Sequence, residues 1–103
     1  MDKLYLVSHI QCWSDQAMEK NFQLFNTKED AIRYKNELKV TIIADLMNYY
    51  DAEDQNDLFR NWCEETHDYE CCWGYLSDDG THEVEIEVDE LDILSWKEMW
   101  LCI

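Results

Sequence analysis

The nine residues His82–Glu90 constrain the fold more than any other stretch of this chain. They read HEVEIEVDE, with a carboxylate at every second position from Glu83 to Asp89 and β-branched residues between them. Successive side chains of a β-strand point to opposite faces, so this pattern predicts a strand with one apolar face and one anionic face. Such a strand belongs in a sheet that is covered on one side and open on the other.

The segment before this strand predicts its partner. Residues 69–77 are rich in aromatic side chains, and Asp79-Gly80 follows them, a pair that tolerates the positive φ angles of a tight hairpin turn. Residues 69–77 and 82–89 are therefore expected to form two arms of an antiparallel hairpin.

A second hairpin is expected at the start of the chain. Residues 4–13 carry apolar side chains on both faces, which favours a strand inside the sheet, and residues 21–25 resemble a short second strand.

Three helical segments are expected. Thr27 with Asp30 approximates a capping box, and apolar residues then recur at steps of three and four for about 23 residues, which predicts one long helix. Residues 51–57 are expected to form a loop and residues 57–65 a short helix. Residues 95–103 are expected to form a helical turn whose Trp96 and Trp100 close the core, or else face a partner or a second copy.

These elements predict one α+β domain over residues 1–103. Its antiparallel sheet of two hairpins would carry the long helix and the short helices on one face. The length suits a single core, and a chain with no proline and two glycines offers no linker.

The formal net charge of −16 is concentrated in the second half of the chain. Residues 1–39 hold equal numbers of acids and bases, whereas residues 40–96 hold seventeen acids and only one base, Arg60. Solubility needs a net charge of only about 2 to 8 in a small domain, so solubility accounts for less than half of this excess.

The cysteines predict thiols and no metal centre. The chain has five, an odd number, and its first residues lack a secretion signal, so reduced cysteines are expected. Cys63, His67, Cys71 and Cys72 are the best metal candidates if the short helix continues past Glu65, but they lack a CxxC spacing. Buried thiols are the expected interpretation, with no metal and no cofactor.

The sequence argues against an enzyme and predicts no catalytic residues. Paired carboxylates act as acid and base only when burial raises the pKa of one of them, and a row on a solvated strand face provides no such difference. His9 and Cys12 fall on opposite faces of their strand, which weakens a Cys-His nucleophile.

Charge and hydropathy set the expected location and exclude two kinds of partner. Phosphates would repel this chain, so direct binding to nucleic acid is not expected. No apolar run approaches the roughly 18 residues that span a bilayer, and the N-terminus lacks a leader sequence, so a cytoplasmic protein without membrane contact is expected.

The expected partner is a basic, nucleic-acid-binding protein. An anionic face can occupy a groove of Lys and Arg in place of phosphates, with fast, salt-sensitive association. Small phage antagonists of host defence and immunity proteins of toxic nucleases act as inhibitors in this way; the analogy rests on size and charge alone. The expected partner-binding residues are those of the strand and of two acidic loops: Glu83, Glu85, Glu87, Asp89, Asp78, Asp79, Asp51, Glu53, Asp54 and Asp57.

The resemblance to DNA is one of sign and linear arrangement. Strand carboxylates recur about every 6.6 Å, whereas phosphates of one DNA strand rise about 3.4 Å each. The alternative is a small acidic interaction domain, monomeric or dimeric, in which the charge serves solubility only.

Overall fold

The computed structural model describes residues 3–13 and 18–92 and contains five strands and two helices. The strands are β1 (Lys3–Trp13), β2 (Glu19–Phe25), β3 (Cys63–Tyr69), β4 (Cys72–Ser77) and β5 (His82–Asp92); the helices are α1 (Lys28–Tyr50) and α2 (Gln55–Asn61). The terminal helical turn expected over 95–103, with Trp96 and Trp100, lies outside the described residues.

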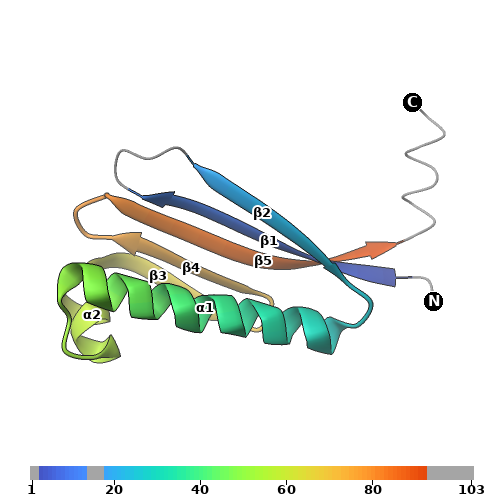
Figure 1. The fold of residues 1–103 in the computed structure, drawn as a ribbon, viewed down its shortest axis with the longest axis horizontal. Helices are drawn as coiled ribbons and strands as arrows, with labels where there is room; N and C mark the ends of the chain where they lie inside the picture. The colour runs from blue at the N-terminus through green and yellow to red at the C-terminus, as the bar shows by residue number, and fades with distance from the viewer. Residues whose placement is uncertain (1–2, 14–17, 93–103) are drawn as a thin grey trace.

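The strands form one antiparallel sheet in the order β2-β1-β5-β4-β3. The β1–β2 and β4–β5 hairpins are present. β5 is the central strand, between β1 and β4, and it pairs with β1 over its full length. Helix α1 runs along one face of this sheet, and α2 lies beside its C-terminal end (Figure 1). The expected α+β fold is therefore confirmed.

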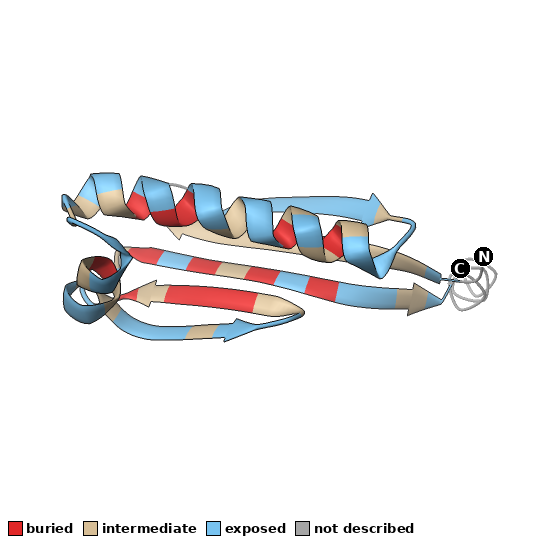
Figure 2. Cartoon of the chain, turned by 90° about the horizontal axis from the view of Figure 1, so that it is seen from below, coloured by how far each residue is buried: buried red, intermediate tan, exposed pale blue. Residues whose placement is uncertain are grey.

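The core lies between α1 and the inner face of the sheet. Val84, Ile86 and Val88 of β5 are buried with Ile42 and Leu46 of α1, and the strand alternates between buried and more exposed residues along most of its length (Figure 2). Trp73 of β4, 1% exposed, is the largest fully buried side chain. The period-two pattern therefore places the carboxylates opposite the helices, on what we call the outer face.

The long helix begins and ends as its sequence indicates. Thr27 accepts a hydrogen bond from the backbone N–H of Asp30, and Asp51 ends the helix in the left-handed conformation, at a φ of 56°. One polar residue of α1 is buried: Lys35 donates from Nζ to the carbonyl oxygens of Tyr69 (2.8 Å) and Glu70 (2.9 Å). These two hydrogen bonds hold the β3–β4 turn against α1.

The prediction of a short helix over residues 57–65 is wrong at both ends. α2 begins at Gln55, inside the predicted loop, because Asp54 caps it, and it ends at Asn61. Residues from Cys63 onwards form β3 instead, a fifth strand that pairs with β4 and displaces the start of β4 to Cys72. The sheet thus consists of one hairpin and a three-stranded meander.

Among the described residues, no helix is both long enough and apolar enough to cross a lipid bilayer.

Candidate functional site

Four predicted carboxylates lie in one row on the outer face of the central strand. Glu83, Glu87 and Asp89 are exposed, and Glu85 is half-buried. The row is about 20 Å long, six residues at about 3.3 Å each. Its alternation with Val84, Ile86 and Val88 in the core fixes every carboxylate on the side away from α1.

On one side of the row, β4 and β3 add no lysine or arginine to the outer face. Leu76, Gly74 and Cys72 of β4 lie directly opposite Glu83, Glu85 and Glu87, so they share the outer face. The next strand, β3, places Glu65, His67 and Tyr69 there. β3, β4 and β5 contain no lysine or arginine, so the strands of this half of the outer face supply neither to offset the row.

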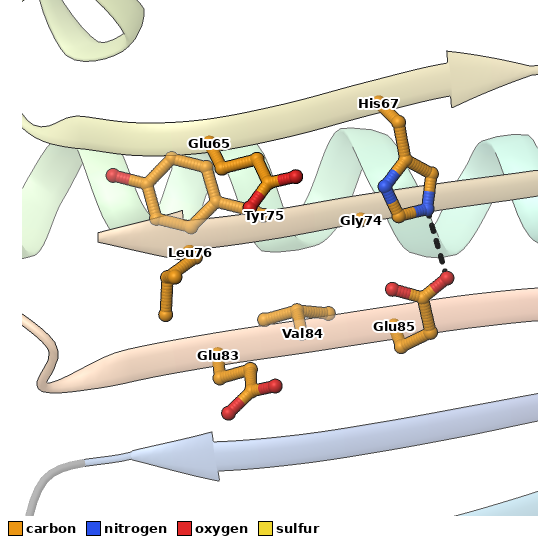
Figure 3. Close-up of a pocket in the computed structure, with 8 residues that line it drawn as sticks. All are labelled: Glu65, His67, Gly74, Tyr75, Leu76, Glu83, Val84 and Glu85. Carbon is orange, nitrogen blue, oxygen red and sulfur yellow. Dashed lines mark hydrogen bonds and ion pairs between the residues drawn. The ribbon is translucent and has the colours of Figure 1, made fainter. Parts of the chain in front are cut away.

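The centre of the row is held by a contact across β4. Nε2 of His67 lies 2.8 Å from Oε1 of Glu85, and the imidazole reaches over Gly74 to make this contact (Figure 3). A Cβ atom on Gly74 would overlap Cε1 of His67 and lie 2.5 Å from Oε2 of Glu85. Because Gly74 has no side chain, a side chain of the edge strand β3 can reach one of the central strand β5 across β4.

A shallow depression of about 150 Å³ surrounds this contact. It is lined by residues of three strands: Glu65, His67, Gly74, Tyr75, Leu76, Glu83, Val84 and Glu85 (Figure 3). Three of these are carboxylates, so the depression suits a cationic side chain that combines an apolar stem with a charged end.

The row influences the acidity of a neighbouring thiol. The pKa of Cys72 is raised, mainly by burial and further by the negative charges of Glu85 and Glu87. A raised pKa keeps the thiol protonated, and hence a poor nucleophile, at neutral pH.

The predicted loop carboxylates at the α1–α2 connection have structural partners. Oδ1 of Asp54 accepts from the backbone N–H of Asp57 (2.8 Å), and Oδ2 of Asp57 accepts from the backbone N–H of Glu53 (2.9 Å). The bond from Glu53, together with one from the side-chain amide of Asn61, lowers the pKa of Asp57. Asp51, Glu53 and Asp54 remain exposed, so this loop keeps its negative charge while it caps α2.

Asp79 in the β4–β5 turn is the centre of a hydrogen-bond network. Its Oδ1 accepts from Ser77 Oγ (2.7 Å), the hydroxyl of Tyr50 (3.1 Å) and both the backbone N–H and the hydroxyl of Thr81. These bonds hold the pKa of Asp79 far below its usual range. Its neighbour Asp78 is exposed, and its backbone N–H donates to the carbonyl of Trp62, which brings this turn beside α2.

His82 anchors the same network from the core. It is 1% exposed, and its Nδ1 lies 2.7 Å from the hydroxyl of Tyr50. Burial lowers the pKa of His82, partly opposed by the charge of Asp79, and burial raises the pKa of Tyr50. The predicted site residues thus form two groups. One is the row on β5, and the other consists of the acidic residues of the α1–α2 connection and the β4–β5 turn, beside the first residues of β5.

The other half of the outer face, on β1 and β2, is largely apolar. Leu6 of β1 lies opposite Leu24 of β2 on one side and Asp89 on the other. Leu24 is 49% exposed and Phe22 is 61% exposed, and Lys20 is the base nearest to them along β2. The anionic row therefore borders an apolar patch.

The arrangement of the strands keeps the possible metal ligands apart from one another, and it also keeps His9 apart from Cys12. A shift in the β3–β4 register between Cys63 and Glu65 puts Cys63 opposite the buried Ser77, while His67 faces outward. In the described ranges, no three His, Cys, Asp or Glu side chains gather where they could hold a metal ion. His9 lies opposite the buried Ile86 and Cys12 opposite the exposed Glu83, on opposite faces as expected.

Sequence reasoning missed Glu65, His67 and Gly74 as part of this surface. Glu65, His67 and Tyr69 do share the period-two spacing of the row, and that spacing is the signal that could have identified a second strand with an outward polar face.

Comparison of the chain with protein-family models, with curated proteins and with solved structures finds no match.

Proposed function

We propose that this protein is a non-enzymatic inhibitor whose anionic face occupies the basic, nucleic-acid-binding groove of a partner protein. The observation that carries the proposal is the row of Glu83, Glu85, Glu87 and Asp89 on an outer face to which β3, β4 and β5 contribute no lysine or arginine. A row of closely spaced carboxylates on the central strand costs stability through self-repulsion, and a cationic partner removes that cost.

The depression at Glu65, Glu83 and Glu85 supports the same role. A partner's arginine or lysine entering it would meet carboxylates from two strands at once. An arginine guanidinium pairs well with carboxylates in such an arrangement because it presents several donors in one plane. Because His67 fixes Glu85 beforehand, less side-chain entropy is lost on binding.

The exposure of the carboxylates favours binding over catalysis. An acid-base pair requires one carboxyl group held in an apolar pocket, whereas Glu83, Glu87 and Asp89 are exposed. The alternative role, an interaction domain whose charge serves solubility, requires only that the charge be present, not that it lie on one face.

A pair of charge-matched variants tests the proposal. Glu83→Gln/Glu85→Gln/Glu87→Gln removes three charges from the row, and Glu29→Gln/Glu37→Gln/Asp45→Asn removes three exposed charges from α1. Each protein is immobilised, a cell lysate is passed over it at about 0.15 M salt, and captured proteins are eluted with duplex DNA.

The wild type and the α1 variant should capture the same basic protein and release it to DNA. The row variant should bind that protein with association slowed on the order of tenfold and with a flatter dependence on salt. Equal capture by all three proteins, or a captured protein that DNA does not displace, would refute groove occupation.

A further inference from the structure

The two edges of the sheet differ in how well they are protected against pairing with another strand. At one edge, β3 carries Glu64, Glu65 and Asp68, and its register with β4 is irregular after Cys63. Acidic side chains and bulges on an edge discourage a further strand from adding. At the other edge, β2 pairs with β1 in an unbroken register and carries one acid and one base, Glu19 and Lys20.

The unprotected edge is also the most exposed strand of the sheet. Every residue of β2 except Phe25 is exposed, and the strand is pale blue along almost its whole length in Figure 2. Within the described residues, β2 has a neighbouring strand on one side only, so its outward backbone N–H and C=O groups face away from the sheet. Phe22 and Leu24 beside them are 61% and 49% exposed.

The distribution of charge allows a second copy of the chain to occupy this edge. A second copy of the chain carries the same net charge of −16, and residues 1–39, which include β1 and β2, contribute none of it. If two copies meet at β2, five strand spacings of about 4.8 Å separate one β5 row from the other, or about 24 Å. That distance is about three Debye lengths at physiological ionic strength, so the rows barely repel each other.

We propose that β2 pairs antiparallel with β2 of a second copy, giving a twofold dimer with a continuous ten-stranded sheet. An axis perpendicular to the sheet keeps both outer faces on the same side, because residues directly opposite in an antiparallel pair share a face. Phe22 and Leu24 of each copy then lie beside those of the other and cover one another. Both β5 rows stay open, so the inference stands independently of the proposed function.

The oligomeric state of lysine variants tests this dimer. The full-length chain is followed by sedimentation velocity over a concentration series at about 0.15 M salt. Phe22→Lys and Leu24→Lys should each raise the dissociation constant of the dimer on the order of tenfold or more. Lysine lowers the net negative charge, so weaker association in these variants cannot come from greater long-range repulsion between the two copies.

Val40→Lys is the matched control. Val40 is an apolar residue of α1, and its exposed fraction of 66% is close to the 61% of Phe22, so this variant should dimerise like the wild type. A wild type that stays monomeric across the series would overturn the proposal, and so would a dimer that persists unchanged in Phe22→Lys.

Hydrogen exchange identifies the edge that pairs, even where a lysine variant fails to fold. In the wild-type dimer, alternate amides of β2 should exchange more slowly at high protein concentration than at low concentration, because only they face the second copy. Concentration-dependent protection in β3 in place of β2 would contradict the inference.

Discussion

Gly74 is the residue on which the geometry of the anionic face depends most directly. The imidazole of His67 occupies the space that a Cβ at position 74 would fill, and in this position it contacts Glu85. Glycine inside a strand normally weakens the sheet, by roughly 0.5 to 1 kcal/mol relative to alanine. At position 74, this loss of stability accompanies the contact between His67 and Glu85, which holds Glu85 at the centre of the row.

This coupling can be measured with a double-mutant cycle. Gly74→Ala in a His67→Ala background should raise the free energy of unfolding by about 0.5 kcal/mol, because the strand gains and only the flexible end of Glu85 has to move. The same change in the wild type should give a smaller gain or a loss, because His67 must leave Glu85. Urea denaturation of the four proteins gives the coupling energy, and equal effects of Gly74→Ala in both backgrounds would contradict this account.

His82 should make the stability of the fold sensitive to mild acid. Burial lowers its pKa in the folded protein below that of the unfolded chain, so the unfolded state binds more protons below pH about 6.5 and stability falls as pH falls. The loss can reach about 1.4 kcal/mol per pH unit between pH about 6.5 and the folded pKa.

The free energy of unfolding at pH about 7.5 and about 5.5 tests this sign. The wild type should lose more stability than His82→Gln over this interval, since glutamine does not titrate. Carboxylates protonate mainly below it and affect both proteins alike. An identical change in the two proteins would show that His82 does not control the acid response.

At the scale of elements, the sequence predicts the strands and helices that have a clear hydrophobic periodicity. It does not predict contacts that depend on how the strands are aligned. β5, α1 and the β1–β2 hairpin have strong patterns, and all three are present. β3 was missed because an edge strand packs little of its surface: of CEETHDY, only Cys63 and His67 are more than slightly covered. The contact of His67 with Glu85 follows from the alignment of β3, β4 and β5, which turn geometry sets and residue spacing alone does not reveal.

The β3–β4 turn should depend on the buried amine of Lys35. Replacing Lys35 by methionine keeps the length of the side chain but leaves the carbonyls of Tyr69 and Glu70 without their donor. The expected loss is about 1 to 3 kcal/mol in the free energy of unfolding. Relative to the wild type, hydrogen exchange should also speed up more in the amides of β3 and β4 than in those of β1, because the loss of stability is local.

Lys28→Met serves as the control for Lys35→Met. Lys28 pairs with the side chain of Glu70 in solvent, so its replacement should change stability little. A Lys35→Met protein as stable as Lys28→Met would mean that water satisfies the turn carbonyls.

At the scale of the whole molecule, crowded negative charge should make the fold more stable in salt. Raising NaCl from about 0.05 to about 0.5 M shortens the distance over which the carboxylates repel one another, so the urea midpoint should rise. The rise should be smaller in Glu83→Gln/Glu85→Gln/Glu87→Gln. A chloride salt is preferred to sulfate, which also strengthens apolar burial. An equal rise in both proteins would show that the row contributes no measurable repulsion.

The unequal charge of the two sides of the sheet has a mechanical consequence. The centre of negative charge is displaced from the centre of mass, toward β3, β4 and β5, because the β1–β2 side belongs to the electrically neutral part of the chain. A body of this kind has a large electric dipole moment, and the field of a cationic surface exerts a torque on it as well as an attraction. The molecule would therefore rotate as it approaches such a surface, and its charged side would already be turned toward that surface before any side chains touch.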